Sequence, residues 1–200
     1  MTKRNRSEGR TGSAAPSSAD VRKEIARLNY RSAFHSSLFT TIAALVIVAA
    51  GALLVANMWL SVFRIFTDSM EPEIPAKVLV AATKTGSPAR GDVVAFYHNN
   101  SILVRRVVGV SGDVIEVDDD GAITVNGRLL DEPYVEAPCL GESNVEYPLT
   151  VPEDRYFVLG DNREKAVDSR NSAVGCVASE LIIGKVIARV WPYEEIGLVR

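Results

Sequence analysis

One uninterrupted apolar segment divides this chain into two unlike parts. Residues 38–60 carry no charged side chain, and they include the run Ile42 to Ala50. Roughly 20 apolar residues in a helix cross the hydrocarbon core of a bilayer, so the segment predicts a single transmembrane helix over residues 36–61. A cleaved signal peptide, with a small-residue site at Ala50-Gly51-Ala52, is the alternative. It is disfavoured because the apolar run continues past that site.

Beyond Ser61 the pattern changes to short β-rich runs separated by glycine, proline and asparagine clusters. This spacing is typical of an antiparallel β domain and not of alternating strands and helices. The last two runs before the proline-rich stretch 131–152 are close enough to form a hairpin. The predicted fold class is therefore mostly β, with one N-terminal transmembrane helix. The predicted strands lie within 62–66, 78–82, 93–97, 102–104, 114–117, 123–127, 156–159 and 182–191.

Charge is distributed unevenly around the apolar segment. Four basic residues precede it closely, whereas only Arg64 follows closely; the four are Arg22, Lys23, Arg27 and Arg31. The positive-inside rule then places the N-terminus in the cytoplasm and the remainder outside the cell membrane. Residues 1–35 are predicted to form a cytoplasmic tail, disordered up to Asp20, with a basic lead-in. A net charge of -3 argues against a nucleic-acid partner.

The two cysteines, Cys139 and Cys176, fall in the part predicted to be extracytoplasmic, where a disulfide can persist. The sequence leaves one bridge and two free thiols equally open. There is no C-x-x-C motif and no cluster of histidine and cysteine, so neither a metal site nor a cofactor is predicted.

Candidate chemistry begins at Thr67-Asp68-Ser69-Met70-Glu71-Pro72. A serine hydroxyl becomes a nucleophile only beside a base and donors for the oxyanion it creates. In an extended chain Thr67 and Ser69 face the same side while Asp68 faces the other, which makes Asp68 a poor base. Alone, these residues fit a turn that leads out of a strand better than a nucleophile.

Three further stretches change that balance. They are Arg90-Gly91-Asp92-Val93-Val94, the stretch Val104 to Asp113, and Gly160-Asp161-Asn162-Arg163 followed by Asp168-Ser169-Arg170. In this order, after one membrane anchor, the set resembles the type I signal peptidase family. The resemblance implies a membrane-anchored serine endopeptidase that removes signal peptides from exported preproteins. It also implies an extracytoplasmic domain over residues 62–200, with a smaller inserted β subdomain at about 112–154.

The resemblance also assigns roles to individual residues. Ser69 matches the nucleophile, and the hydroxyl of Thr67 joins the backbone N–H of Ser69 in the oxyanion hole. By the resemblance, Arg106, Asp168 and Arg170 support the structure of the site. The substrate segment is expected to lie extended between the strand that enters Ser69 and the strand that enters Arg105. Its shallow pockets for small side chains are expected at Ile65, Phe66, Thr67, Met70, Leu103 and Val104.

Two positions depart from the family pattern. Arg105 stands where the family has its general-base lysine, and Ala166 where it has the serine that orients that lysine. A lysine can lose its proton when it is desolvated, whereas a guanidinium, with a pKa above 12, cannot act as a base. Lys165, next to Ala166, is an alternative base.

Two hypotheses follow from these departures. The chain is either an active signal peptidase or a catalytically silent relative. The silent relative would bind segments of exported proteins, or assist the assembly of pilins or other surface proteins.

Overall fold

The computed structural model describes residues 17–199, apart from the side chains at position 20 and at positions 24–36 and 55–57. The predicted disorder of Met1 to Asp20 lies outside the described residues up to position 16, and it is wrong for Ser18 to Asp20, which belong to a helix. The side chains of Arg27 and Arg31, on which part of the orientation argument rests, also lie outside the described residues. The chain divides into two units, Met1–Leu53 and Leu54–Arg200, and each is described by itself.

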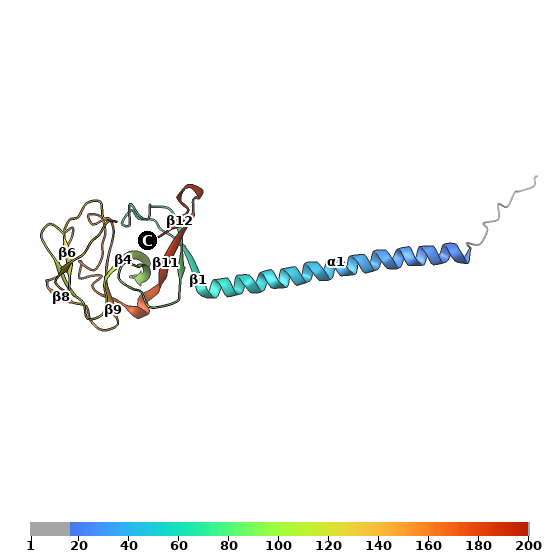
Figure 1. Ribbon diagram of the computed structural model, residues 1–200, viewed down its shortest axis with the longest axis horizontal. Coiled ribbons are helices and arrows are strands. Elements are labelled where there is room, and N and C mark those ends of the chain that lie inside the picture. Colours follow the sequence, from blue (N-terminus) through green and yellow to red (C-terminus); the bar gives the residue numbers. More distant parts are fainter. Residues whose placement is uncertain (1–16, 200) are drawn as a thin grey trace, which may run out of the picture. The chain divides into compact units, whose positions relative to one another are not determined.

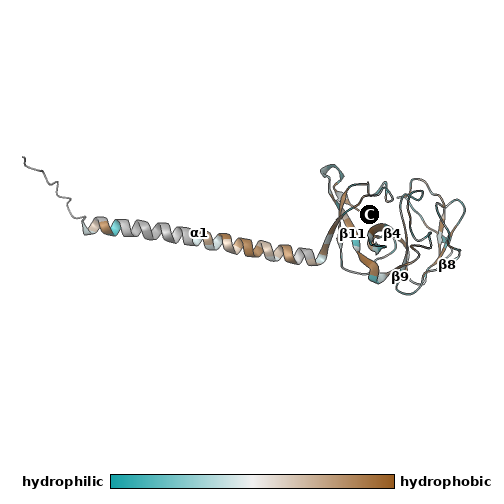
Figure 2. Cartoon of the chain, turned by 180° about the vertical axis from the view of Figure 1, so that it is seen from behind, coloured by the Kyte–Doolittle hydropathy of each residue, from teal (hydrophilic) through white to brown (hydrophobic). Residues whose placement is uncertain are grey.

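A single long helix, α1, runs over Ser18–Trp59. Its stretch Ser37–Leu54 has a mean hydropathy of 2.3, and none of it is buried against the protein. Among the described residues, this is the one helix long and apolar enough to cross a membrane, and Figure 2 shows its hydrophobic colouring. The prediction of one N-terminal apolar helix is confirmed, and the helix is consistent with a membrane anchor.

In the unit Leu54–Arg200 the regular structure beyond the end of α1 consists mainly of strands (Figure 1). They are β1 Leu60–Arg64, β2 Leu79–Thr83, β3 Val93–His98, β4 Ser101–Gly109, β5 Val114–Val117, β6 Ile123–Val125, β7 Arg128–Leu129, β8 Leu149–Thr150, β9 Arg155–Leu159, β10 Val177–Ala178, β11 Ile182–Trp191 and β12 Gly197–Leu198. Two 3-10 helices, η1 Ser179–Leu181 and η2 Tyr193–Glu195, flank β11.

The strands form two antiparallel sheets. The larger has the order β1-β2-β11-β3-β4-β9-β10, with β12 added to β11, and the smaller has the order β7-β6-β5-β8. In Figure 1, β6 and β8 of the smaller sheet lie together, away from β1. The antiparallel β fold is confirmed, and so is the hairpin of β5 and β6. Short strands such as β8 and β12 were not predicted, because two residues are too few to show a β-rich hydrophobic run.

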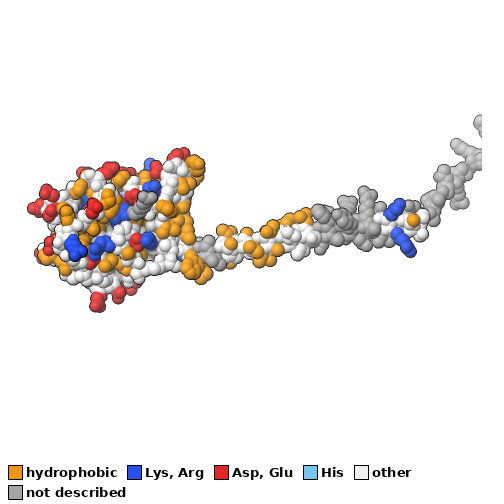
Figure 3. Space-filling model, viewed as in Figure 1, with side chains coloured by type: hydrophobic (Ala, Val, Ile, Leu, Met, Phe, Trp, Pro, Cys, Tyr) orange, Lys and Arg blue, Asp and Glu red, His pale blue; other side chains and the backbone are white. Residues whose placement is uncertain are grey.

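Three hydrophobic clusters fill the space within and between the sheets. One contains Ile65, Met70 and Val104, so it lies directly beneath the segment that carries Ser69. Another, around Phe157, joins the smaller sheet to β4 and β9. Hydrophobic side chains also remain on the surface, as the orange areas of Figure 3 show; among them are Val62, Phe66, Trp191, Tyr193, Ile196 and Leu198.

The register of β4 decides where its two arginines go. In the hairpin of β3 and β4, Arg105 lies opposite Val94 and Arg106 opposite Val93. From Val104 onward every residue of β4 is buried, which happens when both faces of a strand are covered. Because successive side chains alternate between faces, Arg105 and Arg106 enter the interior on opposite sides of the sheet.

Candidate active site

Ser69 lies in a tight turn that follows β1. The backbone N–H of Glu71 donates to the carbonyl of Asp68, and that of Ile74 donates to the carbonyl of Met70. The carbonyl of Ser69 accepts a hydrogen bond of 3.2 Å from the backbone N–H of Asn162. The turn is thereby tied to the loop after β9, and Ser69 is only 3% exposed.

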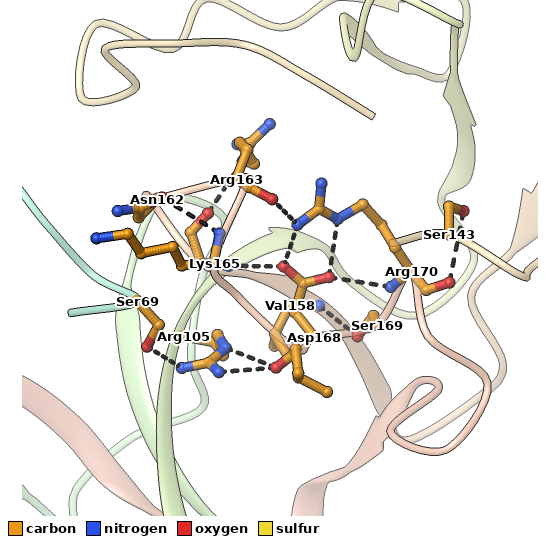
Figure 4. A network of polar contacts seen from close by, with 12 residues as sticks. Ser69, Arg105, Ser143, Val158, Asn162, Arg163, Lys165, Asp168, Ser169 and Arg170 are labelled. Atoms are coloured by element: carbon orange, nitrogen blue, oxygen red, sulfur yellow. Dashed lines mark hydrogen bonds and ion pairs between the residues drawn. The ribbon is translucent and has the colours of Figure 1, made fainter. Parts of the chain in front are cut away.

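The hydroxyl of Ser69 has two polar neighbours. Thr67 Oγ1 lies 3.0 Å from Ser69 Oγ, so the two hydroxyls are on the same side of the chain. On the other side, Nη1 of Arg105 donates a hydrogen bond of 2.8 Å to Ser69 Oγ (Figure 4). Among the described residues, no carboxylate, imidazole or amine forms a hydrogen bond with this hydroxyl.

Arg105 is held rigidly in place by backbone carbonyls. Its Nε and Nη2 both donate to the carbonyl of Val167, at 3.0 and 2.7 Å, and its Nη1 donates to the carbonyl of Val104 at 2.6 Å. Burial lowers the pKa of the guanidinium to about 10, an effect that Asp168 opposes and Arg170 reinforces. With that pKa, only about one molecule in a thousand is deprotonated at pH 7. Arg105 therefore acts on Ser69 as a charged donor.

Asp168 and Arg170 form a bidentate ion pair behind this centre. Arg170 donates from Nε and Nη2 to the two carboxylate oxygens, at 2.9 and 2.8 Å, and both side chains are fully buried. The carboxylate also accepts from the backbone N–H of Gly160 at 3.0 Å. Arg170 extends further to the carbonyls of Leu140 and Arg163. The pair thereby fixes the loop that carries Val167 against Arg105 (Figure 4).

Arg106 supports a different part of the structure. It forms a bidentate pair with Asp161, at 2.9 and 2.5 Å, and its guanidinium lies 4.1 Å from the ring centre of Tyr134. A third bond reaches the carbonyl of Gly91. In the sequence, Asp161 lay in the motif Gly160-Asp161-Asn162-Arg163 without an assigned role. The available signal was that this acidic residue could pair with a buried arginine of the other motif.

Lys165 does not reach Ser69. Its Nζ donates a hydrogen bond of 2.6 Å to Oδ2 of Asp68, and about half of each side chain is exposed. The bond to Asp68 raises the pKa of Lys165, which makes a neutral amine scarcer. This geometry argues against the alternative that Lys165 is a relocated base.

Gly160 and Ala166 pack directly against the serine turn. A Cβ on Gly160 would lie 2.2 Å from Cβ of Ala166 and 2.6 Å from the carbonyl oxygen of Ser69. Only a glycine allows this approach. The side chain at position 166 thus packs against Gly160 beside the serine turn, and a methyl group offers no hydrogen bond there.

A groove of about 530 Å³ lies beside the segment that carries Ser69, and Thr67 is part of its lining. Its lining includes five residues that were expected there, and four that were not; together they are Phe63, Arg64, Ile65, Phe66, Thr67, Ser101, Ile102, Leu103 and Val104. Met70 is not among them. Its side chain is fully buried in the core with Ile74, because the turn directs it beneath Ser69. The expectation that Met70 contacts substrate is therefore corrected: it anchors the turn.

Comparison with known proteins agrees with these features. Residues 38–191 match the family described as signal peptidase, peptidase S26. The chain belongs to this family. It is 33% identical over 145 residues to a probable signal peptidase I-2 of Synechocystis, covering 66% of this chain and 64% of that protein. It is 35% identical over 154 residues to signal peptidase IB of Staphylococcus aureus, covering 66% of this chain and 78% of that protein.

A crystal structure of a signal peptidase I from Enterococcus faecalis also aligns with this S26 family member. The alignment covers 51% of this chain and 98% of that one, with 31% identity and a TM-score of 0.42. In the structure of this family member, Cys139 and Cys176 are not joined by a disulfide.

Proposed function

We propose that this chain functions as a signal peptidase of type I, anchored in the cell membrane by α1 and acting on the signal peptides of exported preproteins. The N-terminus would face the cytoplasm and residues 62–200 the outside, with 36–61 in the membrane and an inserted subdomain at about 112–154. The observation that carries the proposal is the apolar groove whose lining residue Thr67 is hydrogen-bonded to the buried hydroxyl of Ser69.

The groove lies between two strand edges that have free backbone groups. Ile65 directs its N–H and C=O toward the segment before β2, so Arg64 and Phe66 direct theirs the other way. On β4, Val107 bonds toward β3, so by the same alternation Ile102 and Val104 direct theirs away from it, although the carbonyl of Val104 already accepts a hydrogen bond from Arg105. An extended peptide between these edges would pair with both, and side-chain pockets would supply selectivity.

The floor of the groove favours small side chains. Ile65 and Val104 are almost fully buried and belong to the same core cluster, so neither can withdraw to make room. Phe66, by contrast, is 73% exposed at the rim. A shallow, fixed apolar floor suits alanine-sized residues of a signal peptide. This fit supports signal peptides as the substrate class.

In the proposed reaction Ser69 is the nucleophile and Thr67 helps to stabilise the oxyanion. Arg105, which we place at the position of the family's general-base lysine, stabilises negative charge on Ser69 but cannot accept its proton. A positioned base typically contributes about 10²–10⁴-fold to the rate. Turnover by this arrangement is therefore expected to be slow.

A second candidate function is binding without cleavage, directed at segments of exported or surface proteins. It is favoured by one specific observation, that Arg105 donates to Ser69 Oγ and so occupies a lone pair of the nucleophile. The groove and its strand edges serve such a binder equally well.

Incubation of the detergent-solubilised full chain with a radiolabelled preprotein tests both candidates. Cleavage at the signal-peptide junction that disappears in Ser69→Ala identifies a peptidase. Crosslinking of the intact signal segment to the groove, with a wild type no faster than Ser69→Ala, identifies a binder. A preprotein that is neither cleaved nor crosslinked contradicts both.

A further inference from the structure

Arg105 differs from the other arginines in the interior of the C-terminal unit. Arg106, Arg163 and Arg170 are each paired with a carboxylate, from Asp161, Glu132 and Asp168 respectively. Arg105 is only 3% exposed, yet all four of its hydrogen bonds go to uncharged oxygens. Asp168 and Asp161 act on this guanidinium electrostatically without a hydrogen bond to it, and a buried charge without a directly bonded counter-charge is costly. The guanidinium is therefore suited to an anion that approaches along its hydrogen bonds to Ser69.

The guanidinium is bonded to residues at or next to the part of the groove lined by Thr67 and Val104. Thr67 and Val104 belong to the groove lining. The hydroxyl of Thr67 is hydrogen-bonded to that of Ser69, and the carbonyl of Val104 accepts a hydrogen bond from Arg105. An anionic group at this part of the groove would face a cation without having to enter the core.

The two hydroxyls extend the positive charge toward the groove. Arg105 donates to Ser69 Oγ, and Ser69 and Thr67 share one further hydrogen bond. Two hydroxyl protons are present, and that bond uses one of them. The remaining O–H is free to donate to a ligand, at the end of a chain of bonds that is polarised by the guanidinium.

The groove indicates which kind of anion fits. Its two strand edges offer backbone partners over Ser101 to Val104, a length of about 13 Å for four residues of extended chain. In an extended peptide a side-chain carboxylate projects perpendicular to the strand, whereas the α-carboxylate continues along it. Only the C-terminal carboxylate therefore reaches the end of the groove while the backbone stays paired.

We propose that this site retains extended peptides by their free C-terminal α-carboxylate, which accepts hydrogen bonds from the Thr67–Ser69 hydroxyls in front of Arg105. The inference rests on the proposed function in one respect, because the peptide occupies the same groove. It deepens that function by naming the ligand class: small-residue peptides that end at this point. In this proposal Arg105 does not take a proton from Ser69. Its positive charge instead favours binding of the peptide carboxylate.

The test compares one labelled, alanine-rich hexapeptide with a free carboxylate and the same peptide with a C-terminal amide. Anisotropy with the full-length, detergent-solubilised protein gives both dissociation constants. We expect the acid to bind about 10–100-fold more tightly, as for a hydrogen bond to a charged group. Arg105→Gln should equalise the two peptides, whereas Arg105→Lys should keep the preference. Arg128→Gln, at an exposed position of β7, is the matched control and should behave as wild type.

Each remaining outcome is decisive. Equal binding of acid and amide to the wild type overturns the inference but leaves the groove, and the proposed function, intact. A preference that persists in Arg105→Gln also overturns it. Failure of both peptides to bind removes the proposed groove together with the inference. If Arg105→Gln does not fold, the comparison of acid with amide on the wild type still decides.

Discussion

In the hydrogen bond of 2.8 Å that joins Arg105 to Ser69, the arginine is the donor and the serine the acceptor. A general base requires the opposite direction, in which the serine donates its proton. The charge on Arg105 makes the direction unambiguous, because a protonated guanidinium has no acceptor atom. The nucleophile is thus well positioned but lacks a partner that can take its proton.

Restoring a base should therefore raise the cleavage rate. We predict that the double variant Arg105→Lys/Ala166→Ser cleaves a preprotein about 10²-fold faster than wild type, or more. The lysine would supply an amine that can be deprotonated, and the serine a hydroxyl to orient it, since position 166 adjoins the serine turn. Initial rates on one preprotein measure the effect.

Two further variants frame this comparison. Arg105→Lys alone should gain less, because its amine lacks the orienting hydroxyl. Adding Ser69→Ala to the double variant should remove the gain completely. A double variant no faster than wild type would show that Arg105 is not what limits the rate.

Replacing Lys165 should have little effect on the rate. Its Nζ is bonded to Asp68 and its side chain is half exposed, so Lys165→Ala removes a surface ion pair of small value. We predict an unchanged dependence of the cleavage rate on pH. Asp68→Asn, which releases Lys165 without deleting it, is the control. Loss of all activity in Lys165→Ala, with normal folding, would instead identify Lys165 as the base.

A larger side chain on the floor of the groove should weaken peptide binding. We predict that Val104→Phe reduces the affinity for a small-residue peptide about tenfold, as expected for the loss of about 1.4 kcal/mol. Because Val104 also belongs to the core, the substitution should lower the free energy of unfolding by about 1–3 kcal/mol. Val186→Phe overpacks the same cluster without touching the groove. Equal loss of affinity in both variants would attribute the effect to stability alone.

The buried pair of Asp168 and Arg170 should dominate local stability. Asp168→Asn leaves a buried guanidinium without its carboxylate, and we predict a loss of about 3–5 kcal/mol in the free energy of unfolding. Asp92→Asn, which breaks the more exposed pair with Lys185, should cost less than about 1 kcal/mol. Urea unfolding followed by tryptophan fluorescence measures both. Similar losses in the two variants would contradict the structural role given to Asp168.

Protease protection measures the proposed orientation. When protease is added to intact protoplasts, we expect digestion of residues 62–200 and survival of an N-terminal tag, because the basic residues lie before the apolar segment. Permeabilised protoplasts, in which both ends are accessible, are the control. A protected C-terminal domain would reverse the orientation.

Local patterns in the sequence were sufficient for most of the fold. The apolar run predicted α1, and the alternation of hydrophobic runs with turn residues predicted long strands such as β3 and β11. Such signals are strong because they repeat over many residues. They also placed Thr67 and Ser69 on one side of the chain, where their hydroxyls meet.

The remaining features depend on contacts between distant residues. The partner of Arg106 is Asp161, 55 positions away, and Lys165 pairs with Asp68, 97 positions away. No local pattern distinguishes these partners from other acidic residues of the chain. Met70 was misplaced for a related reason. The turn after Ser69 breaks the extended alternation, so its side chain turns into the core.

The position of the two strand edges that border the groove, on β1 and β4, has a consequence for solubility. Unpaired edges are templates on which other chains stack into aggregates, and proteins commonly guard them with charge or proline. Here residues of β1 and β4 line the same groove, so one extended strand placed between them would pair with both. A strand that enters satisfies both edges at once and leaves no new edge for the next. The geometry that admits one peptide strand therefore prevents further strands from adding at this groove.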